Sequence, residues 1–479
     1  MKQIEKESGF SVFDLMVKAG QAVCAQAEKD LGEEDHVLII AGNGNNGGDG
    51  YVIAKYLPRP CRVFAPLGMP KTDAAKQARK LLKRGQIVKK SDFEEALKEA
   101  DVVIDCVFGF GYHGRLPEEI RPVFRMIRKM KKRVLSVDIN SGCEADTGAC
   151  DNDALVSDIT YALDCFKPFH VMRKDHHMFK EAVIVPLGLP HPASLALPEM
   201  DEEEFFRSFP KKKDNAHKTS EGRILIAGGG TGMAGALILN LIGARTMGAS
   251  YIDVMIPENI YEITASKIIT AVYHPFGWHT MEPVAEPLIE NAKVIAFGSG
   301  AVNFPKNREF LDLALQNSTV PVILDAEALR IMVHNTYLFR FVRCPVILTP
   351  HIGEFSALIG RQVHETIDEK IALAKKFAVE NDVYLVLKGP HTTVFSPAGD
   401  MYINQSGNEA LAQAGSGDLL TGIMAACLAV NNDIFKAICM AVFIHGHIAD
   451  IGLAEMSVRG FDLEAYPRIM DQLFRKHAL

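Results

Sequence analysis

The segment at residues 43–50 constrains this chain more than any other, because it reads Asn-Gly-Asn-Asn-Gly-Gly-Asp-Gly. An apolar run at 37–41 precedes it, and a helical pattern at 51–57 follows it. A strand, a glycine-rich turn and a helix in that order present backbone N–H groups and the positive end of a helix to a phosphate. The two adjacent Asn and the Asp add side-chain oxygens that can hold a cation or a ligand hydroxyl. The sequence therefore predicts an α/β domain with a phosphate-binding turn.

Length and composition limit the class of protein. The chain has 479 residues, of which 48% are hydrophobic and 23% charged, as in a soluble globular protein of about two to three domains. A net charge of -7 and a pI near 6.2 argue against a nucleic-acid-binding surface. No stretch of about eighteen apolar residues is free of charge, and the N-terminus lacks the apolar core of a signal peptide. We expect a cytoplasmic protein with no nucleic-acid or membrane partner.

The nine cysteines are scattered and form no Cys-x-x-Cys pair. Most of them lie in apolar runs such as 102–107 and 423–429. We expect small buried hydrophobic residues in a reducing compartment, and neither disulfides nor a zinc site. The histidines at 176, 177, 445 and 447, and the single Trp278, are expected to pack rather than to bind metal.

Two alternations of apolar runs and helical patterns predict two parallel sheets covered by helices on both faces. In the first, strands are expected at 37–41, 61–65, 102–105, 133–137 and 183–185, and helices at 11–30, 50–57, 72–84, 92–99 and 118–130. In the second, strands are expected at 223–227, 250–255, 293–297, 321–324, 345–348, 383–387 and 392–395, and helices at 414–430 and 434–452. A stretch rich in Pro and charge runs separates them. The predicted domains are 1–195 and 216–479, with a linker at 196–215.

Polar side chains gather at the predicted strand ends of the first domain. Asn46, Asp105 and Ser141 each come from a different strand end, and Asp138 ends the same strand that Ser141 follows. Open α/β sheets bind ligands at the carboxyl ends of their strands, so we expect these side chains to lie close together. Any one such Asp could simply cap a helix. Three oxygen donors without His or Cys suit a hard cation better than zinc.

Five motifs of the first domain occur in the order found in one known family. They are the segments 41–50, Asp105 with 108–111, 137–142, 146–148 and 187–190. On these motifs, residues 1–195 resemble the NAD(P)H-hydrate epimerase family. The resemblance implies a Rossmann-like three-layer sandwich that interconverts the R and S forms of hydrated NADH and NADPH (NADHX and NADPHX).

The same resemblance implies the residues of the site. A potassium ion (K+) is expected at Asn46, Asp105 and Ser141. The expected substrate-binding residues are Asn45, Asn46, Gly47, Gly48, Asp49, Gly109, Phe110, Gly111, Tyr112, His113, Gly114, Arg115 and Asp138. Moving a hydroxyl between the faces of a reduced nicotinamide ring requires proton transfer and a stabilised ring cation, and one carboxylate can serve both needs. We therefore hypothesise that Asp138 is the catalytic acid/base. The sequence departs from the family at Phe110, Asn140 and the pair Val17-Lys18.

In the second domain, residues 414–418 read Ala-Gly-Ser-Gly-Asp and open a helix. Backbone N–H groups at such a helix start form an anion cradle, here Gly415, Ser416 and Gly417, with Asp418 at its mouth. This pairing suits phosphoryl transfer, because the carboxylate can take a proton from the attacking hydroxyl. The alternative is a tight turn with an Asp cap. His351, in Thr-Pro-His-Ile-Gly-Glu, and Lys388, in Lys-Gly-Pro-His-Thr, each follow a predicted strand.

These motifs, in this order, resemble the ribokinase-like superfamily and, within it, the NAD(P)H-hydrate dehydratase family. The resemblance covers about residues 210–479. It implies a ribokinase-like α/β domain in which ADP (bacterial members) or ATP (eukaryotic members) phosphorylates the S-hydrate, with magnesium (Mg2+) bound to the nucleotide. Loss of the phosphate then restores NAD(P)H, leaving AMP and phosphate when ADP is used. Catalysis is expected from Asp418, hydrate binding from Ala236, Gly300, His351 and Asp418, and nucleotide binding from Lys388, Gly389, Pro390, His391, Thr392, Gly415, Ser416 and Gly417.

A chain with both modules in this order resembles the bifunctional NAD(P)H-hydrate repair enzymes, an isomerase and a lyase in one polypeptide. Two other functions stay open. The second domain could be a vitamin-type kinase for a hydroxymethyl pyrimidine or pyridine, or the first domain could bind without catalysing. The second domain departs from the pattern of the dehydratase family at residues 298–303, Glu327, Gln405 and Leu411. These departures bear on the choice of substrate or nucleotide. The motifs do not decide whether ADP or ATP is the co-substrate, or whether NADHX or NADPHX is the preferred substrate. We expect a homo-oligomer.

Overall fold

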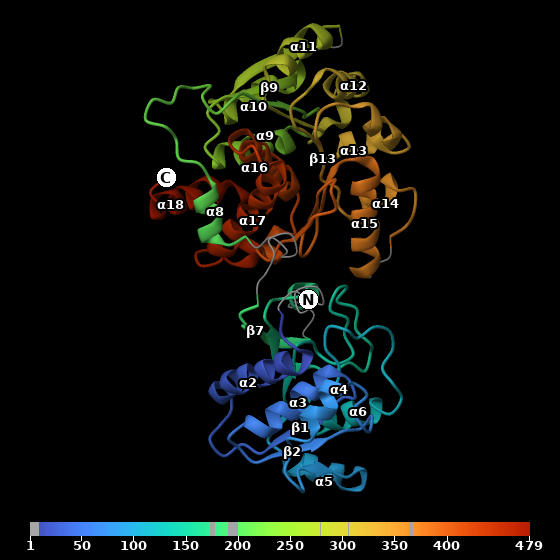
Figure 1. The fold of residues 1–479 in the computed structure, drawn as a ribbon. Helices are drawn as coiled ribbons and strands as arrows, with labels where there is room; N and C mark the ends of the chain where they lie inside the picture. Colours follow the sequence, from blue (N-terminus) through green and yellow to red (C-terminus); the bar gives the residue numbers. More distant parts are fainter. Residues whose placement is uncertain (1–8, 173–177, 190–199, 278, 305, 364–366) are drawn as a thin grey trace. The chain divides into compact units, whose positions relative to one another are not determined.

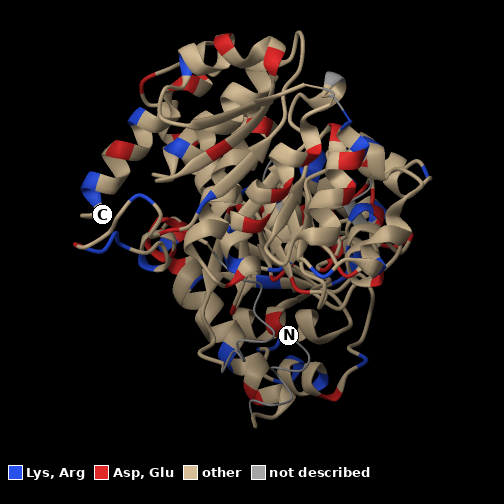
Figure 2. Ribbon diagram, turned by 90° about the horizontal axis from the view of Figure 1, so that it is seen from above, with Lys and Arg blue, Asp and Glu red and all other residues tan. Residues whose placement is uncertain are grey.

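The chain divides into two compact units in the computed structural model, which describes residues 9–172, 178–189, 200–277, 279–304, 306–363 and 367–479. Unit 1 is Met1–Ala196 with Thr366–Asp368, and unit 2 is Leu197–Glu365 with Glu369–Leu479. The histidines 176 and 177, Trp278 and part of the predicted linker lie outside the described residues. Lys and Arg are interspersed with Asp and Glu along the described chain (Figure 2).

Unit 1 contains a seven-stranded parallel sheet in the order β3-β2-β1-β4-β5-β6-β7. Its strands are β1 (Val37–Ala41), β2 (Cys61–Phe64), β3 (Ile87–Val88), β4 (Val102–Cys106), β5 (Arg133–Val137), β6 (Ser157–Leu163) and β7 (Phe179–Val185). Its helices are α2 (Val12–Asp30), α3 (Asn45–Tyr56), α4 (Asp73–Arg79), α5 (Phe93–Glu99), α6 (Arg121–Lys129) and α7 (Pro168–Met172). The strand order, reversing direction between β1 and β4, is that of a Rossmann fold.

Helices cover both faces of this sheet, as predicted. Helices α2, α3 and α4 share one apolar core with Ile39 of β1, and α5 and α6 share the other with Leu38 and Ile40 (Figure 1). Helix α2 begins as the sequence predicts, since the Ser11 hydroxyl accepts a hydrogen bond from the backbone N–H of Asp14 at 3.1 Å. The first unit is therefore a three-layer sandwich.

Two expectations for unit 1 are wrong in detail. The segment 43–50 is not a turn ahead of a helix, because α3 already begins at Asn45 and Gly44 is its N-cap. Strands β3 and β6 were not predicted. The apolar pattern does not predict strand β6 because this strand buries polar residues. The hydroxyls of Ser157 and Thr160 both hydrogen-bond to the Asn140 side chain, at 3.0 and 2.6 Å.

Unit 2 contains a nine-stranded mixed sheet in the order β10-β9-β8-β11-β12-β13-β14-β15-β16, parallel up to β14 and antiparallel beyond. Its strands are β8 (Ile224–Ala227), β9 (Ile252–Pro257), β10 (Val272–Phe276), β11 (Val294–Phe297), β12 (Val322–Leu324), β13 (Val346–Leu348), β14 (Tyr384–Leu387), β15 (Thr393–Phe395) and β16 (Met401–Ile403). Its helices are α8 (Glu202–Ser208), α9 (Ala234–Thr246), α10 (Glu258–Lys267), α11 (Met281–Asn291), α12 (Asn307–Asn317), α13 (Glu327–Met332), α14 (Ile352–Leu358), α15 (Ile367–Asn381), α16 (Ser416–Val430), α17 (Ile434–Gly452) and α18 (Tyr466–Lys476).

Helices again form two layers around this sheet. Helices α9, α16, α17 and α18 pack on one face, and α11 to α15 pack on the other (Figure 1). Helix α17 is long and apolar enough to cross a membrane, but 67% of its apolar window is buried inside the unit, as in a core helix. Strands β10 and β16 were not predicted.

Residues 201–209, which the composition assigns to the linker, form helix α8 and its ends. Phe205, Phe206 and Phe209 are buried in the core of unit 2. The acidic run is also engaged: Glu202 pairs with Lys476 and with His477 at 2.6 Å. Unit 2 therefore includes residues that composition alone attributes to a linker.

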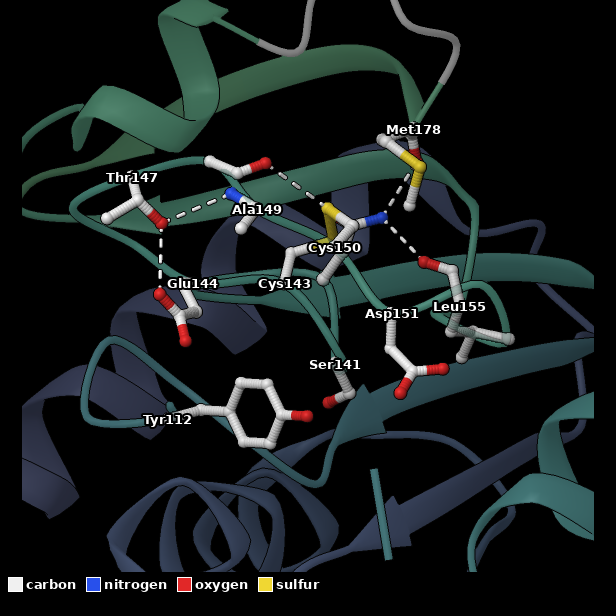
Figure 3. The surroundings of a disulfide bond; sticks show 12 residues. Tyr112, Ser141, Cys143, Glu144, Thr147, Ala149, Cys150, Asp151, Leu155 and Met178 are labelled. Carbon is white, nitrogen blue, oxygen red and sulfur yellow. Dashed lines mark hydrogen bonds between the residues drawn. A yellow bond between two sulfur atoms is a disulfide. The ribbon is translucent and has the colours of Figure 1, made fainter. Parts of the chain in front are cut away.

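The expectation that no cysteines form disulfides is wrong at one position. Cys143 and Cys150 are joined by a disulfide across a short hairpin in unit 1 (Figure 3). An antiparallel bridge pairs these two residues, and the Glu144 N–H donates to the carbonyl of Ala149 at 2.8 Å. The hairpin, not a spacing motif, brings the thiols together, so no pattern in the sequence indicates this bond. The other seven cysteines are free, and six of them are buried as expected.

Candidate active sites

The first candidate site lies where β1 and β4 end. Helix α3, which follows β1, packs on one face of the sheet, and Tyr112 and Leu116, which follow β4, pack on the other. The two connections therefore diverge and leave a crevice at the carboxyl end of the sheet. Glycine lets the backbone close up here: a Cβ on Gly47 would lie 2.0 Å from the carbonyl oxygen of Gly42.

The predicted cation ligands meet in this crevice. Asp105 is fully buried, and its carboxylate accepts hydrogen bonds from the Ser141 hydroxyl at 2.6 Å, from the Ser141 N–H at 2.9 Å and from Ser136 at 3.1 Å. Burial raises the pKa of Asp105, although these hydrogen bonds oppose the rise. The described residues contain no Lys or Arg paired with Asp105. Asn46 Oδ1 is buried and accepts no hydrogen bond from them.

These features fit a hard cation. A buried carboxylate without a cationic partner and an orphaned amide oxygen are the donors that a hard cation takes in proteins. Asn46 is itself fixed, because its Nδ2 donates to the carbonyl of Val137 at 3.3 Å.

Asp138 stands beside this set, directly after β5. It is 3% exposed and has a left-handed backbone with φ of 69°. Its Oδ2 accepts a hydrogen bond from the Phe110 N–H at 2.7 Å, and a Cβ on Gly109 would lie 2.9 Å from Oδ2. Lys167 Nζ lies 2.7 Å from Oδ1 as an ion pair. The carboxylate is thus held against the 109–115 segment.

The predicted substrate segment 109–115 is half-buried at its start and exposed at its end. Gly109 and Phe110 lie at Asp138, whereas Gly111, His113 and Arg115 are exposed. The Gly114 N–H donates to Glu144 Oε1 at 2.8 Å, which ties this segment to the disulfide hairpin. Among the predicted residues of α3, Asn45 is exposed and Gly48 and Asp49 are buried.

The departures Asn140 and Val17-Lys18 have structural roles. The Asn140 side chain is fully buried and donates to the carbonyls of Leu155 and Met178 at 2.9 and 2.8 Å. Val17 packs against the core of unit 1, and Lys18 lies over the Phe10 ring at 5.0 Å.

The second candidate site lies at the start of α16 in unit 2. Gly415 has φ of 94° and is the N-cap, so the N–H groups of the next residues point out of the helix end. Asp418, in the first turn, is half-buried. Burial and the charge of Asp325 raise the pKa of Asp418 to about 6, although a hydrogen bond from Ser299 and the charge of Lys388 lower it. A carboxylate with this pKa suits general-base catalysis near neutral pH.

Lys388 is not the surface lysine of a hairpin. Its Nζ lies 2.7 Å from Asp325 Oδ1 and 3.2 Å from where a Cβ of Gly417 would be. Although burial lowers the pKa of Lys388, the charges of Asp325, Glu354 and Asp418 raise it overall. The lysine therefore stays charged against the helix start, where a phosphate would lie.

Asp325 is held by two more side chains. Its Oδ1 accepts from Thr349 at 2.8 Å and its Oδ2 from Thr421 of α16 at 3.1 Å. The next residue, Ala326, has φ of 46°, a conformation that a non-glycine residue rarely adopts. Strain of this kind collects at functional sites.

Ala236 and Gly300, two predicted hydrate-binding residues, lie side by side. A Cβ on Gly300 would lie 3.0 Å from the Cβ of Ala236. Ser299, one residue earlier, accepts from Asn240 at 3.1 Å and hydrogen-bonds to Asp418. The structure thus links this pair to the predicted base.

His351 is the N-cap of α14 in a capping box with Glu354. Its Nδ1 accepts from the N–H groups of Gly353 and Glu354 at 3.0 and 3.2 Å, so the neutral ring carries its proton on Nε2. The side chain is 61% exposed and lines a cleft of about 450 Å³ together with Glu327 and Arg330. His351 can therefore donate to a ligand while it caps the helix.

The predicted nucleotide segment 388–392 forms the turn between β14 and β15. Its turn is closed by Thr392, whose hydroxyl donates to the carbonyl of Gly389 at 3.0 Å, and His391 has φ of 56°. Gly389 and Pro390 are exposed, so they are accessible to a ligand. At the cradle, Ser416 is buried, with its hydroxyl 3.3 Å from His445 Nε2.

Comparison with known proteins gives the family of this chain. The profile of the NAD(P)H-hydrate dehydratase family matches residues 224–469, just over half of the 479 residues. A curated relative from Archaeoglobus fulgidus, the bifunctional NAD(P)H-hydrate repair enzyme Nnr, is 30% identical over 452 residues, which are 92% of this chain and 90% of the relative. The chain belongs to the NAD(P)H-hydrate dehydratase family.

The first unit of this NAD(P)H-hydrate dehydratase family member matches a second profile, that of the YjeF-related protein N-terminus, over residues 12–169. The solved ADP/ATP-dependent NAD(P)H-hydrate dehydratase from Bacillus subtilis, co-crystallised with ATP and Mg2+, is 31% identical with a TM-score of 0.53, over 59% of this chain and 99% of that chain. A ribokinase-like superfamily protein from Enterococcus faecalis, 23% identical with a TM-score of 0.51, covers 58% of this chain and 95% of its own.

The predicted family, the two α/β folds and the repair function are thereby confirmed. The structure brings four further residues to the sites: Lys167 and His170 at Asp138, and Asp325 and Ser299 at Asp418. The sequence already indicates Lys167 as a possible part of the first site and Asp325 as a carboxylate at a strand end, whereas sequence reasoning missed His170 and the contact of Ser299 with Asp418. Asp325 follows a predicted strand, which is a signal, but nothing in the sequence pairs Asp325 or Lys167 with its partner.

Proposed function

We propose that unit 2 carries out the nucleotide-dependent dehydration of S-NADHX and S-NADPHX with Asp418 as the general base. The supporting observation is that Asp418 stands at the opening of the α16 cradle, with its pKa raised to about 6 and Lys388 beside it. The carboxylate takes the proton of the hydrate hydroxyl as that oxygen attacks the terminal phosphoryl group. Lys388 and the N–H groups of Ser416 and Gly417 stabilise the charge on the moving phosphoryl group.

The remaining predicted residues orient the two substrates. Ala236, Gly300 and His351 bind the hydrate, with His351 donating from Nε2. Lys388, Gly389, Pro390, His391 and Thr392, together with Gly415, Ser416 and Gly417, bind the nucleotide. The described residues contain no three-ligand cluster of His, Cys, Asp or Glu, which suits Mg2+ held chiefly by nucleotide phosphates and water.

We further propose that unit 1 epimerises R- and S-NAD(P)HX with Asp138 as the acid/base. Support comes from the buried Asp138 carboxylate beside the 109–115 segment, which accepts a hydrogen bond from the Phe110 N–H at 2.7 Å and pairs with the Lys167 ammonium at 2.7 Å. Its negative charge also stabilises the cation that forms on the ring. Substrate binding is assigned to Asn45–Asp49 and Gly109–Arg115.

Potassium would be held in unit 1 by Asn46, Asp105 and Ser141. The orphaned Asn46 Oδ1 and the buried Asp105 support this assignment. When bound, the ion supplies positive charge that attracts the phosphates of the substrate. ADP or ATP as co-substrate, a homo-oligomeric state and a cytoplasmic location stay predictions.

A coupled assay tests both activities. Mixed R and S hydrates are supplied with ADP or with ATP, and the absorbance of reduced nicotinamide is followed. We expect complete conversion with at least one nucleotide. Conversion of about half of the mixture would remove the epimerase from the proposal, and no conversion with either nucleotide would remove the dehydratase.

A further inference from the structure

Asp138 is held by one short segment of unit 1, residues 163–170, whose part in the proposed function has not been assigned. Lys167 is 5% exposed, and its ammonium lies 2.7 Å from Asp138 Oδ1. The same ammonium donates a hydrogen bond to the carbonyl of Leu163 at 2.6 Å, so the side chain is fixed from two sides. His170 is 3% exposed, and its Nε2 lies 2.7 Å from the carbonyl oxygen of Asp138.

The two residues also hold one another. The Lys167 N–H donates to His170 Nδ1 at 2.9 Å, which places the ring proton on Nε2 and makes that nitrogen the donor to the Asp138 carbonyl. Burial and the charge of Lys167 lower the pKa of His170 to about 4, so the ring is neutral at physiological pH. Lys167 therefore supplies the positive charge of this group of three.

The backbone of Asp138 needs such support. Its φ of 69° is unusual for a residue other than glycine, and this conformation persists only where the surroundings hold it. The hydrogen bonds to the Asp138 carbonyl from His170 and to Oδ2 from Phe110 fix the backbone and the carboxylate. Leaving a buried carboxylate without a cation is costly, and the Lys167 ammonium supplies that cation.

We propose that Lys167 is a positioning residue of the epimerase site, which with His170 holds the Asp138 carboxylate in place and directed at the substrate. Lys167 is too deeply buried to bind the hydrate itself, so it acts through Asp138. This inference rests on the proposed role of Asp138. It predicts that the charge of Lys167 matters for turnover and not for substrate binding.

Three variants separate charge from tethering. Lys167→Gln keeps a donor for the Leu163 carbonyl but removes the charge, and Lys167→Arg keeps the charge. Lys180→Gln is the matched control, because Lys180 is 81% exposed on β7 and pairs with Asp158. Epimerisation is measured at saturating and at limiting hydrate, and the dehydratase activity of the same chain reports intact protein.

For Lys167→Gln we expect a fall in kcat of roughly 100-fold with KM changed less than about threefold. Lys167→Arg should recover at least about tenfold of that loss, and Lys180→Gln should match the wild type. An unchanged kcat for Lys167→Gln, equal losses for Gln and Arg, or a loss confined to KM would overturn the proposal.

Folding and the proposed function are tested separately. His170→Asn removes the hydrogen bond from His170 Nε2 to the Asp138 carbonyl and leaves the Lys167–Asp138 ion pair in place. We expect kcat of this variant to fall roughly tenfold. Unfolding of unit 1 in both Lys167→Gln and His170→Asn would assign the segment a structural role and overturn the inference. If the wild type does not epimerise, the proposed function fails instead. In that case a crystal structure of Lys167→Gln tests the positioning role separately. A rotated Asp138 carboxylate would support this role, and an unmoved carboxylate would contradict it.

Discussion

The two units use one residue type, aspartate, in opposite electrostatic settings. Asp138 of unit 1 faces a buried ammonium directly, at 2.7 Å, and lies on a strained loop behind a strand. Asp418 of unit 2 lies in the first turn of a helix, near a second carboxylate, Asp325, which itself takes the ammonium of Lys388. The comparison indicates that unit 1 places a cation directly against its carboxylate. Unit 2 instead raises the proton affinity of its carboxylate so that it can act as a base.

The largest expected effect separates the two carboxylates. Asp418→Asn should lower dehydration by at least about 100-fold and leave epimerisation unchanged, because the amide cannot take a proton. Asp138→Asn should do the reverse. Both rates are measured on purified full chains. Loss of both activities in either variant would break the assignment of one carboxylate to each unit.

The glycine at the start of α3 should matter nearly as much for unit 1. Gly47→Ala places a Cβ 2.0 Å from the Gly42 carbonyl oxygen, so we expect unit 1 to lose about 3 kcal/mol of stability and its epimerase activity. Gly44→Ala is the control, because a Cβ there meets nothing within 4 Å. Chemical denaturation followed with both assays measures the difference. Equal stability of the two variants would contradict the close approach of these backbones.

The disulfide should stabilise one unit alone. Replacing Cys143 and Cys150 together by Ala should lower the stability of unit 1 by about 2 kcal/mol and leave the dehydratase of unit 2 unaffected. Thermal melting with and without a reducing agent measures this. A wild-type protein whose melting is insensitive to reduction, with two titratable thiols at these positions, would show that the bond does not form.

The smallest expected effect concerns pH. Because the pKa of Asp418 is raised to about 6, dehydration should decline as the pH falls through about 6, where the base becomes protonated. Asp325 contributes to that rise, so Asp325→Asn should move the decline toward lower pH, by roughly one unit. A pH–rate profile of kcat/KM for both proteins gives the answer. A shift of the decline toward higher pH would contradict the role of the Asp325 charge in raising the pKa of Asp418.

Much of both sheets could be predicted from the sequence, because buried parallel strands such as Val37–Ala41 and Val294–Phe297 are continuous apolar runs. The site segments could also be placed, since Asp105, Asp138 and Ser141 follow such runs directly. Strand β6 could not, because its buried Ser157 and Thr160 are satisfied by Asn140, a contact across 17 and 20 residues of sequence.

The contacts that tune each site were also beyond the sequence. The Lys167–Asp138 pair and the Lys388–Asp325 pair join strand ends that only the strand order of each sheet brings together. The start of α3 was placed too late, since three glycines in the first two turns argue against a helix by propensity, although close backbone packing requires them. Tertiary contact overrides local preference at all of these positions.

The most direct measurement mixes two disabled chains. Asp138→Asn and Asp418→Asn are each given R and S hydrates with nucleotide, first alone and then together, and the restored NAD(P)H is followed. We expect the first chain alone to convert only the S share at early times, the second alone to convert nothing, and the mixture to convert both shares. Full conversion by the Asp138→Asn chain alone, at the wild-type rate, would contradict the division of labour between the two units.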